Sequence, residues 1–147
     1  MQFNLERDPR THTFISYAPG QVVVTIPWRE GDDTPLLVDR DGEVRGRIRH
    51  ETLTTSVIVM PEQLIRNWPP QTPTEITAAH FEAVAALQPE VVLFGSGARL
   101  WWPPSSLLEP FIKRGIGIEV MDTAAACRTY NILVYEARNV AAALLMI

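Results

Sequence analysis

The first half of the chain places short runs of β-branched and aromatic residues between turn residues, which is the pattern of β-hairpins. Phe14–Tyr17 and Gln21–Ile26 are two such runs. Pro19 and Gly20, which separate them, form a common turn signal. The pattern therefore predicts a first hairpin close to the N-terminus.

A second hairpin is predicted from Leu36–Val38 and Val44–Ile48, because Asp41 and Gly42 between them can supply the positive φ of a tight turn. Ser56–Val59 follows as a continuous apolar run, which is typical of a strand covered on both faces. After this strand, Pro61 is expected to open a short helix that ends at Arg66.

The second half alternates helical and strand patterns, with Ser, Thr or Asp at the predicted helix starts. The predicted order is a helix from Thr74 or Thr77 to about Leu87, a strand at Val91–Phe94, a helix from Ser105 or Ser106 to about Arg114, a strand at Ile116–Met121, and a helix from Asp122 or Thr123 to about Arg138.

The tail Val140–Ile147 is apolar throughout, so its periodicity fits a helix or a strand. Asn139 tolerates the left-handed conformation and can stop the preceding helix, which favours a final strand at Val140–Met146. Alternating strands and helices indicate a layered α/β core, and we expect residues 1–147 to form a single domain.

Composition narrows the function classes. The chain has 147 residues, of which 46% are hydrophobic and 20% charged, as in a globular protein. A net charge of −4 argues against nucleic-acid binding, which needs a basic surplus. The charged N-terminus lacks the core of a signal peptide, and no apolar run reaches the roughly 18 residues of a membrane-spanning helix. We therefore expect a cytoplasmic protein without membrane insertion.

Three segments carry a resemblance to a known family: Val91–Gly97, Gly115–Thr123 and Ala126–Leu133. They resemble the Mth-type domain family of small uncharacterised α/β proteins, which includes a mitochondrial complex I assembly factor and the adipogenesis-associated Mth domain-containing protein. The resemblance implies a three-layer α/β fold whose mixed central sheet has a last strand antiparallel to its neighbours. It also implies action through other proteins, as assembly or regulatory factors, and no particular reaction.

Gly95, Ser96 and Gly97 end a buried strand, at the place where open α/β sheets bind ligands. They form either a tight packing turn or one wall of a cleft, whose other side would be the start of the third helix at Asp122 and Thr123. The motif matches neither a phosphate-binding loop nor a nucleophile elbow.

The start of the third helix has two interpretations. Asp122 or Thr123 can cap the helix, or the first amides and Arg128 can hold an anion. Arg128 and Asn131 are spaced i, i+3, so they form either a solvated polar face or a pair that reaches toward the glycine-rich turn.

Candidates for catalysis and metal binding are weak. The single cysteine, Cys127, lies in a stretch of small residues and is expected to be buried and structural. His12, His50 and His80 have no spacing that ties them to Cys127 or to a metal. We expect no catalytic residue, no metal and no cofactor.

Trp101 and Trp102 are adjacent, so in an extended chain they point to opposite sides and cannot both enter one core. They line either a protein interface or a cleft. The preferred interpretation is a non-enzymatic protein-interaction or assembly factor with an unidentified protein partner, and self-association is a further option. The alternative is a small-molecule-binding protein or an unassigned enzyme that uses the cleft at Gly95-Ser96-Gly97.

Overall fold

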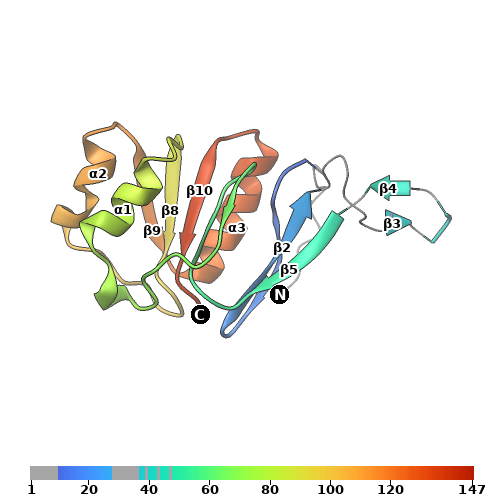
Figure 1. Ribbon diagram of the computed structural model, residues 1–147, viewed down its shortest axis with the longest axis horizontal. Helices are drawn as coiled ribbons and strands as arrows, with labels where there is room; N and C mark the ends of the chain where they lie inside the picture. The colour runs from blue at the N-terminus through green and yellow to red at the C-terminus, as the bar shows by residue number, and fades with distance from the viewer. Residues whose placement is uncertain (1–9, 28–36, 39, 43, 47) are drawn as a thin grey trace.

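The computed structural model describes residues 10–27, 37–38, 40–42, 44–46 and 48–147 (Figure 1). Leu36, predicted to begin the second hairpin, and the charged residues 1–9 lie outside the described residues. Within these ranges the chain forms two main sheets, of three and five strands, a separate two-stranded sheet and three α-helices.

The three-stranded sheet contains the first predicted hairpin. Strands β1 (Phe14–Ala18) and β2 (Gln21–Pro27) are antiparallel, and Gly20 in their turn has a φ of 77°. The second hairpin is also confirmed, because β3 (Leu37–Val38) and β4 (Val44–Gly46) pair antiparallel and Gly42 has a φ of 83°.

Strand β5 (Ile48–Leu53) was not predicted, and it completes the three-stranded sheet in the order β1-β2-β5. It pairs antiparallel with β2 along its whole length. Its sequence, Ile-Arg-His-Glu-Thr-Leu, is mostly polar because β5 is an edge strand with several exposed residues. A strand of this kind lacks the apolar run from which the sequence analysis identified strands.

The five-stranded sheet has the order β7-β6-β10-β8-β9. Its strands are β6 (Val57–Val59), β7 (Leu64–Ile65), β8 (Val91–Gly95), β9 (Gly117–Met121) and β10 (Val140–Leu144). The predicted final strand, β10, lies in the centre, where every one of its residues is buried. It is antiparallel to β6 and parallel to β8, so the expectation of a strand antiparallel to its neighbours holds on one side only.

The helix predicted from Pro61 to Arg66 is wrong. The amide of Met60 donates to the carbonyl of Gln63, and this tight turn sends the chain back as β7 along β6. Proline fits the first turn of a helix and a tight turn equally well, and only the pairing with β6 decides between them. The segment is therefore a short edge hairpin.

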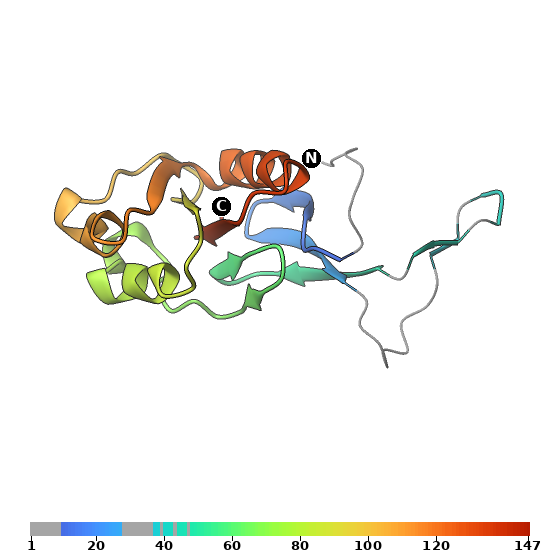
Figure 2. The same ribbon diagram turned by 90° about the horizontal axis from the view of Figure 1, so that it is seen from above.

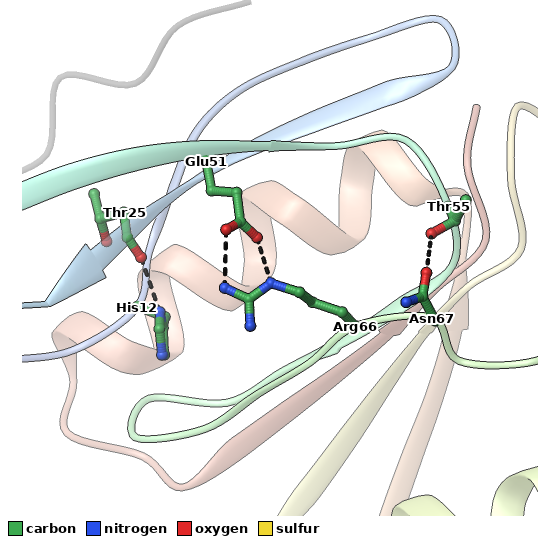
Figure 3. A network of polar contacts seen from close by, with 6 residues as sticks. All are labelled: His12, Thr25, Glu51, Thr55, Arg66 and Asn67. Carbon is green, nitrogen blue, oxygen red and sulfur yellow. Dashed lines mark hydrogen bonds and ion pairs between the residues drawn. The ribbon is translucent and has the colours of Figure 1, made fainter.

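Polar side chains bridge the two sheets where β5 and β7 approach each other. Figure 3 shows Arg66, directly after β7, forming two hydrogen bonds with Glu51 of β5, of 2.6 and 2.9 Å. Thr55 donates to Asn67 nearby, over 3.1 Å. The hydrogen bond from Arg66 lowers the pKa of the Glu51 carboxyl. The charges of Glu51 and Arg66 therefore pair with each other across the two sheets.

Helices α1 (Ala78–Ala85) and α2 (Glu109–Ile112) cover one face of the five-stranded sheet, while α3 (Thr123–Tyr135) and the three-stranded sheet cover the other (Figures 1 and 2). Phe81, Phe94 and Phe111 are buried in the first interface, and Phe14 and Tyr130 in the second. The predicted three-layer α/β fold with a mixed central sheet is confirmed.

Helix ends follow the predicted caps more closely than the predicted stops. Thr77 caps α1 and Asp122 caps α3. The predicted cap at Ser105 or Ser106 is wrong, because Ser105–Leu108 is a 3-10 helix without a side-chain cap, which shortens α2 to a single turn that begins at Glu109. Ala137 has a φ of 60°, so α3 ends at Tyr135, before the expected stop at Asn139.

Candidate functional site

Three chain segments meet at the carboxyl ends of β8 and β10 and line a groove of about 470 Å³. Residues 71–73 lead into α1, residues 96–101 follow β8, and residues 145–147 follow β10. The C-terminal end of the chain lies at this end of the sheet in Figure 1. Ligands of open α/β sheets bind at this edge. Of the residues predicted for the cleft, Ser96 and Gly97 line the groove, and Gly95, Asp122, Thr123, Arg128 and Asn131 do not.

Ser96 is 3% exposed and its hydroxyl is used within the loop. The Oγ atom donates to the carbonyl of Arg99 over 2.7 Å and accepts from the amide of Trp101 over 3.0 Å. No base contacts this hydroxyl among the described residues. Ser96 therefore fixes the conformation of residues 96–101 and lacks the partner of a nucleophile.

Gly95 and Gly97 allow the loop to approach α3 and β10 closely. A Cβ atom at Gly95 would lie 2.7 Å from Cδ2 of Leu144 and 3.0 Å from Cα of Thr123. Gly97 has a φ of 102°, which side chains disfavour. The packing-turn interpretation accounts for both glycines, and residues 96 and 97 also line the groove.

Thr123 joins these elements from a buried position. Its Oγ1 accepts from the amide of Gly97 over 2.9 Å and donates to the carbonyl of Leu145 over 2.6 Å. The predicted proximity of the glycine-rich turn and the start of α3 is therefore correct. Thr123 is fully buried, however, and does not line the groove.

Asp122 caps α3, because its Oδ1 accepts from the amide of Ala125 over 2.8 Å. The amide of Thr123 donates to the carbonyl of Gly97. Two of the first amides of the helix are thus already paired, and a carboxylate occupies the position of an incoming anion. The geometry supports the cap interpretation over the anion site.

Arg128 and Asn131 bond to β1 and not to residues 95–97, which corrects the interpretation that they reach the glycine-rich turn. The Asn131 side chain accepts from the amide of Phe14 and donates to its carbonyl, each over 2.9 Å. Arg128 donates to the Tyr17 hydroxyl over 2.7 Å, and its guanidinium lies over the Tyr17 ring. Both side chains lie on the side of α3 that packs against β1.

Cys127 is a buried free cysteine, as predicted. Burial raises the pKa of its thiol to about 12, so the reactive thiolate is scarce at neutral pH. Among the described residues, no group of three His, Cys, Asp or Glu side chains could hold a metal ion.

Trp101 and Trp102 separate as the alternation of an extended chain requires. The Trp101 ring is partly buried against Phe94, with ring centroids 6.5 Å apart. Trp102 is 65% exposed and Leu100, on the other side of Trp101, is 54% exposed. Trp101 and Leu100 therefore line the groove, and Leu100 together with the exposed Trp102 is called the apolar ridge below.

The other walls of the groove were not predicted from the sequence. Residues 71–73 were interpreted as a stiff connection, residues 145–147 as the end of a strand, and Arg99 was not singled out. A proline-rich connection before a helix is a weak local signal for a wall. Residues 145–147 and 96–101 meet because β10 and β8 are neighbours in the sheet. The order of strands in a sheet cannot be read from the sequence.

A family model described as "Protein of unknown function (DUF498/DUF598)" matches residues 39–145. A crystal structure of a Bordetella parapertussis protein has 32% identity and a TM-score of 0.70, covering 92% of this chain and 95% of that one. The solution structure of a Xanthomonas campestris protein has 33% identity and a TM-score of 0.66, covering 99% and 92%. A Bordetella pertussis relative is described as a domain of the Mth type.

Curated relatives include NADH dehydrogenase [ubiquinone] 1 alpha subcomplex assembly factor 3 of Danio rerio, 35% identical over 67% of this chain and 57% of the relative. The "13 kDa major membrane protein" of Francisella tularensis is 37% identical over 44% and 53%. The chain thus matches about half the length of these relatives. Among the described residues, no helix is long and apolar enough to cross a membrane.

Proposed function

This chain belongs to the Mth-type family described as proteins of unknown function (DUF498/DUF598), and from that membership we propose that it is a protein-binding module of the assembly-factor kind. The proposed docking surface is the ridge of Leu100 and Trp102 with the adjoining groove. One domain spanning residues 1–147 and a cytoplasmic location remain part of this proposal.

The exposure of Trp102 is the observation that carries the proposal. A tryptophan that is 65% exposed costs solvation free energy in the isolated chain. Trp and Arg are the residues most enriched at the energetic centres of protein interfaces. The exposed side chains of Leu100 and Trp102 are thus available to pack against a partner protein.

The loop that carries these side chains is held before any partner arrives. Ser96 closes residues 96–101 with two hydrogen bonds, and Pro103, directly after Trp102, is buried. A loop ordered in advance loses less conformational entropy on binding. The loop therefore holds the exposed Trp102 side chain in a fixed position, which supports its role in docking a partner.

The relatives support the class of partner. Several are named as assembly factors for NADH dehydrogenase, which is said of those proteins and extends to this chain as part of the proposal. A role in assembly requires a surface for another protein and no catalytic group.

The test compares Trp102→Ala with Trp101→Ala, two truncations of the same residue type at adjacent positions. The tagged variants are used to recover partners from a lysate of the native organism, while sedimentation follows self-association. We expect Trp102→Ala to keep the melting temperature and lose at least about 2 kcal/mol of partner binding. Trp101→Ala removes partly buried packing and should lower the melting temperature. Unchanged recovery with Trp102→Ala would rule out this surface.

The groove itself favours a second candidate, a small-molecule-binding protein or unassigned enzyme. Its volume of about 470 Å³ lies in the range of small-molecule sites. A thermal-shift screen with a metabolite library tests it. A stabilising compound whose effect disappears in an Ala98→Trp variant, which should crowd the groove from an exposed position, would favour this alternative.

A further inference from the structure

We propose that the groove receives a short peptide segment in which an apolar side chain stands near an aspartate or glutamate, and that Arg99 pairs with this carboxylate. The inference rests on the proposed protein-binding function and names the chemistry of the partner. It follows from three properties of the groove: its satisfied floor, its charge and the ridge beside it.

The polar groups on the floor of the groove are already paired within the chain. The Ser96 hydroxyl donates to the carbonyl of Arg99, and the amide of Trp101 donates to that hydroxyl. The amide of Gly97 donates to Thr123, and the amide of Leu145 to the carbonyl of Gly95. These paired groups of Ser96, Gly97, Trp101 and Leu145 offer no free hydrogen bond to a ligand. An apolar side chain needs none, and Leu145, Met146 and Trp101 can pack against it.

Arg99 carries the one charged side chain among the residues that line the groove. Arg99 is exposed, and its guanidinium forms no hydrogen bond or ion pair with the described residues. By contrast, Arg114 pairs with Glu82 and Arg138 with Glu90. A guanidinium at the rim of an apolar groove is suited to a carboxylate that arrives with an apolar group.

The acidic residue nearest in sequence to the opposite wall does not neutralise Arg99. The Glu75 carboxylate accepts from the amides of Gln71, over 2.5 Å, and Thr72, over 3.4 Å. It therefore holds residues 71–73 in place as a wall. The Arg99 guanidinium therefore remains available at the rim of the groove.

The ridge gives such a segment a second contact. Leu100 and Trp102 are two residues apart and both exposed, while Trp101 between them turns toward Phe94. One apolar side chain of the segment fits the groove, and its neighbours can pack on the ridge. The volume of about 470 Å³ holds a few side chains and not a folded face, which favours a linear segment.

The experiment selects a phage library of random 12-residue peptides on four immobilised proteins: the wild type, Arg99→Lys, Arg99→Glu and Trp102→Ala. On the wild type we expect enrichment of Asp or Glu near Leu, Ile, Phe or Trp. Arg99→Lys should retain this preference and Arg99→Glu should replace the acidic residue by Lys or Arg. Trp102→Ala should enrich no peptide.

The best acidic peptide is then labelled and titrated by fluorescence polarisation. Arg99→Glu should weaken its binding about tenfold, and Arg99→Lys by only about threefold, since the charge is kept and the planar fork is lost. Arg99 is exposed, so the melting temperatures should match the wild type. If Arg99→Glu is unstable, Arg99→Gln serves in its place and should equalise acidic and basic peptides.

Three outcomes would overturn the inference: enriched peptides without acidic residues, an acidic preference that persists on Arg99→Glu, or no enrichment above Trp102→Ala. A wild-type dimer that Trp102→Ala dissociates, without any enriched peptide, would identify a second copy as the occupant and would also overturn it. The lysate experiment separates this failure from that of the proposed function. If Trp102 is needed for partner recovery but no acidic motif appears, the docking surface stands and the partner chemistry is wrong.

Discussion

The contact between α3 and β1 and the loop at residues 96–102 use their polar groups differently. In the first region, Asn131 and Tyr130 are buried and bond to the backbone of β1 and the residues before it. In the second region, Ser96 pairs inside the loop, and apolar Leu100 and Trp102 face solvent. From the sequence, residues in both regions were predicted to belong to a functional site. The difference teaches that buried, paired polar residues maintain the fold, whereas exposed apolar residues on a rigid loop are left without packing partners in the chain, which is why the docking surface is proposed there.

The largest expected effect comes from placing the same charge in the core and in the loop. Ala142 is fully buried in β10, between β6 and β8, while Ala98 is exposed. Ala142→Asp should cost about 4 kcal/mol or more, because an unpaired carboxylate is buried. Ala98→Asp should change the free energy of unfolding by less than about 0.5 kcal/mol. Urea unfolding measures both, and similar losses would refute the contrast.

Thiol reactivity makes the same comparison chemically. Burial raises the pKa of Cys127 to about 12, so at pH 8 its thiolate should be scarcer than that of an exposed thiol by about a factor of a thousand. The control is Ala98→Cys in a Cys127→Ala background, which exposes one thiol on the loop. An aromatic disulfide reagent should modify the control at least about a thousandfold faster than native Cys127. Comparable rates would show that the region around α3 opens readily.

The hydrogen bonds of Asn131 should account for much of the α3 to β1 contact. Asn131→Ala leaves the amide and carbonyl of Phe14 without their partner, which should cost about 2 to 4 kcal/mol. Arg128→Ala is the control on the same helix. Arg128 is exposed, so its loss should cost less than about 1 kcal/mol. Equal effects in urea unfolding would assign Asn131 no special structural role.

The smallest effect should come from the exposed bridge between the two sheets. Arg66 lowers the pKa of Glu51 below its ordinary value of 4.5, so the folded state binds the Glu51 proton less tightly than the unfolded state. The bridge therefore stabilises the fold above about pH 4.5, and this contribution is lost as pH falls through the lowered pKa. Solvent screening limits it to less than about 1 kcal/mol.

Glu51→Gln should remove this pH-dependent contribution and leave partner binding at Trp102 unchanged. Urea unfolding at pH 7 and at pH 3 measures the free energy of unfolding of the wild type and of Glu51→Gln. The wild type should lose more stability than Glu51→Gln between these two values. An equal loss would show that other carboxyl groups determine the acid sensitivity.

Much of the fold could be predicted because its signals are local. Thr77 and Asp122 were recognised as helix caps from their own neighbourhoods, and the apolar tail was correctly assigned to a strand. Strand β5 and the hairpin containing β7 could not be predicted, since partly exposed edge strands lack an apolar run. Their identity depends on pairing with β2 and β6.

The candidate site was predicted in part. The turn at residues 95–97 was placed correctly beside the start of α3, because both follow parallel strands that end at one edge. Arg128 and Asn131 were assigned to the wrong surface, since spacing along a helix shows which residues share a face and not what that face touches. The walls at residues 71–73 and 145–147 required the strand order.

By itself the sequence determined most of the alternation of strands and helices, the capped starts of α1 and α3, the buried cysteine and the family resemblance, because each depends on neighbouring residues or on a linear motif. Only the tertiary structure decided that β10 is parallel to β8 and antiparallel to β6, and that Asn131 bonds to Phe14, 117 positions away. It also decided that Trp101 turns inward while Trp102 stays exposed. Contacts between distant residues depend on how the layers pack as a whole, and no local pattern of residues encodes that packing.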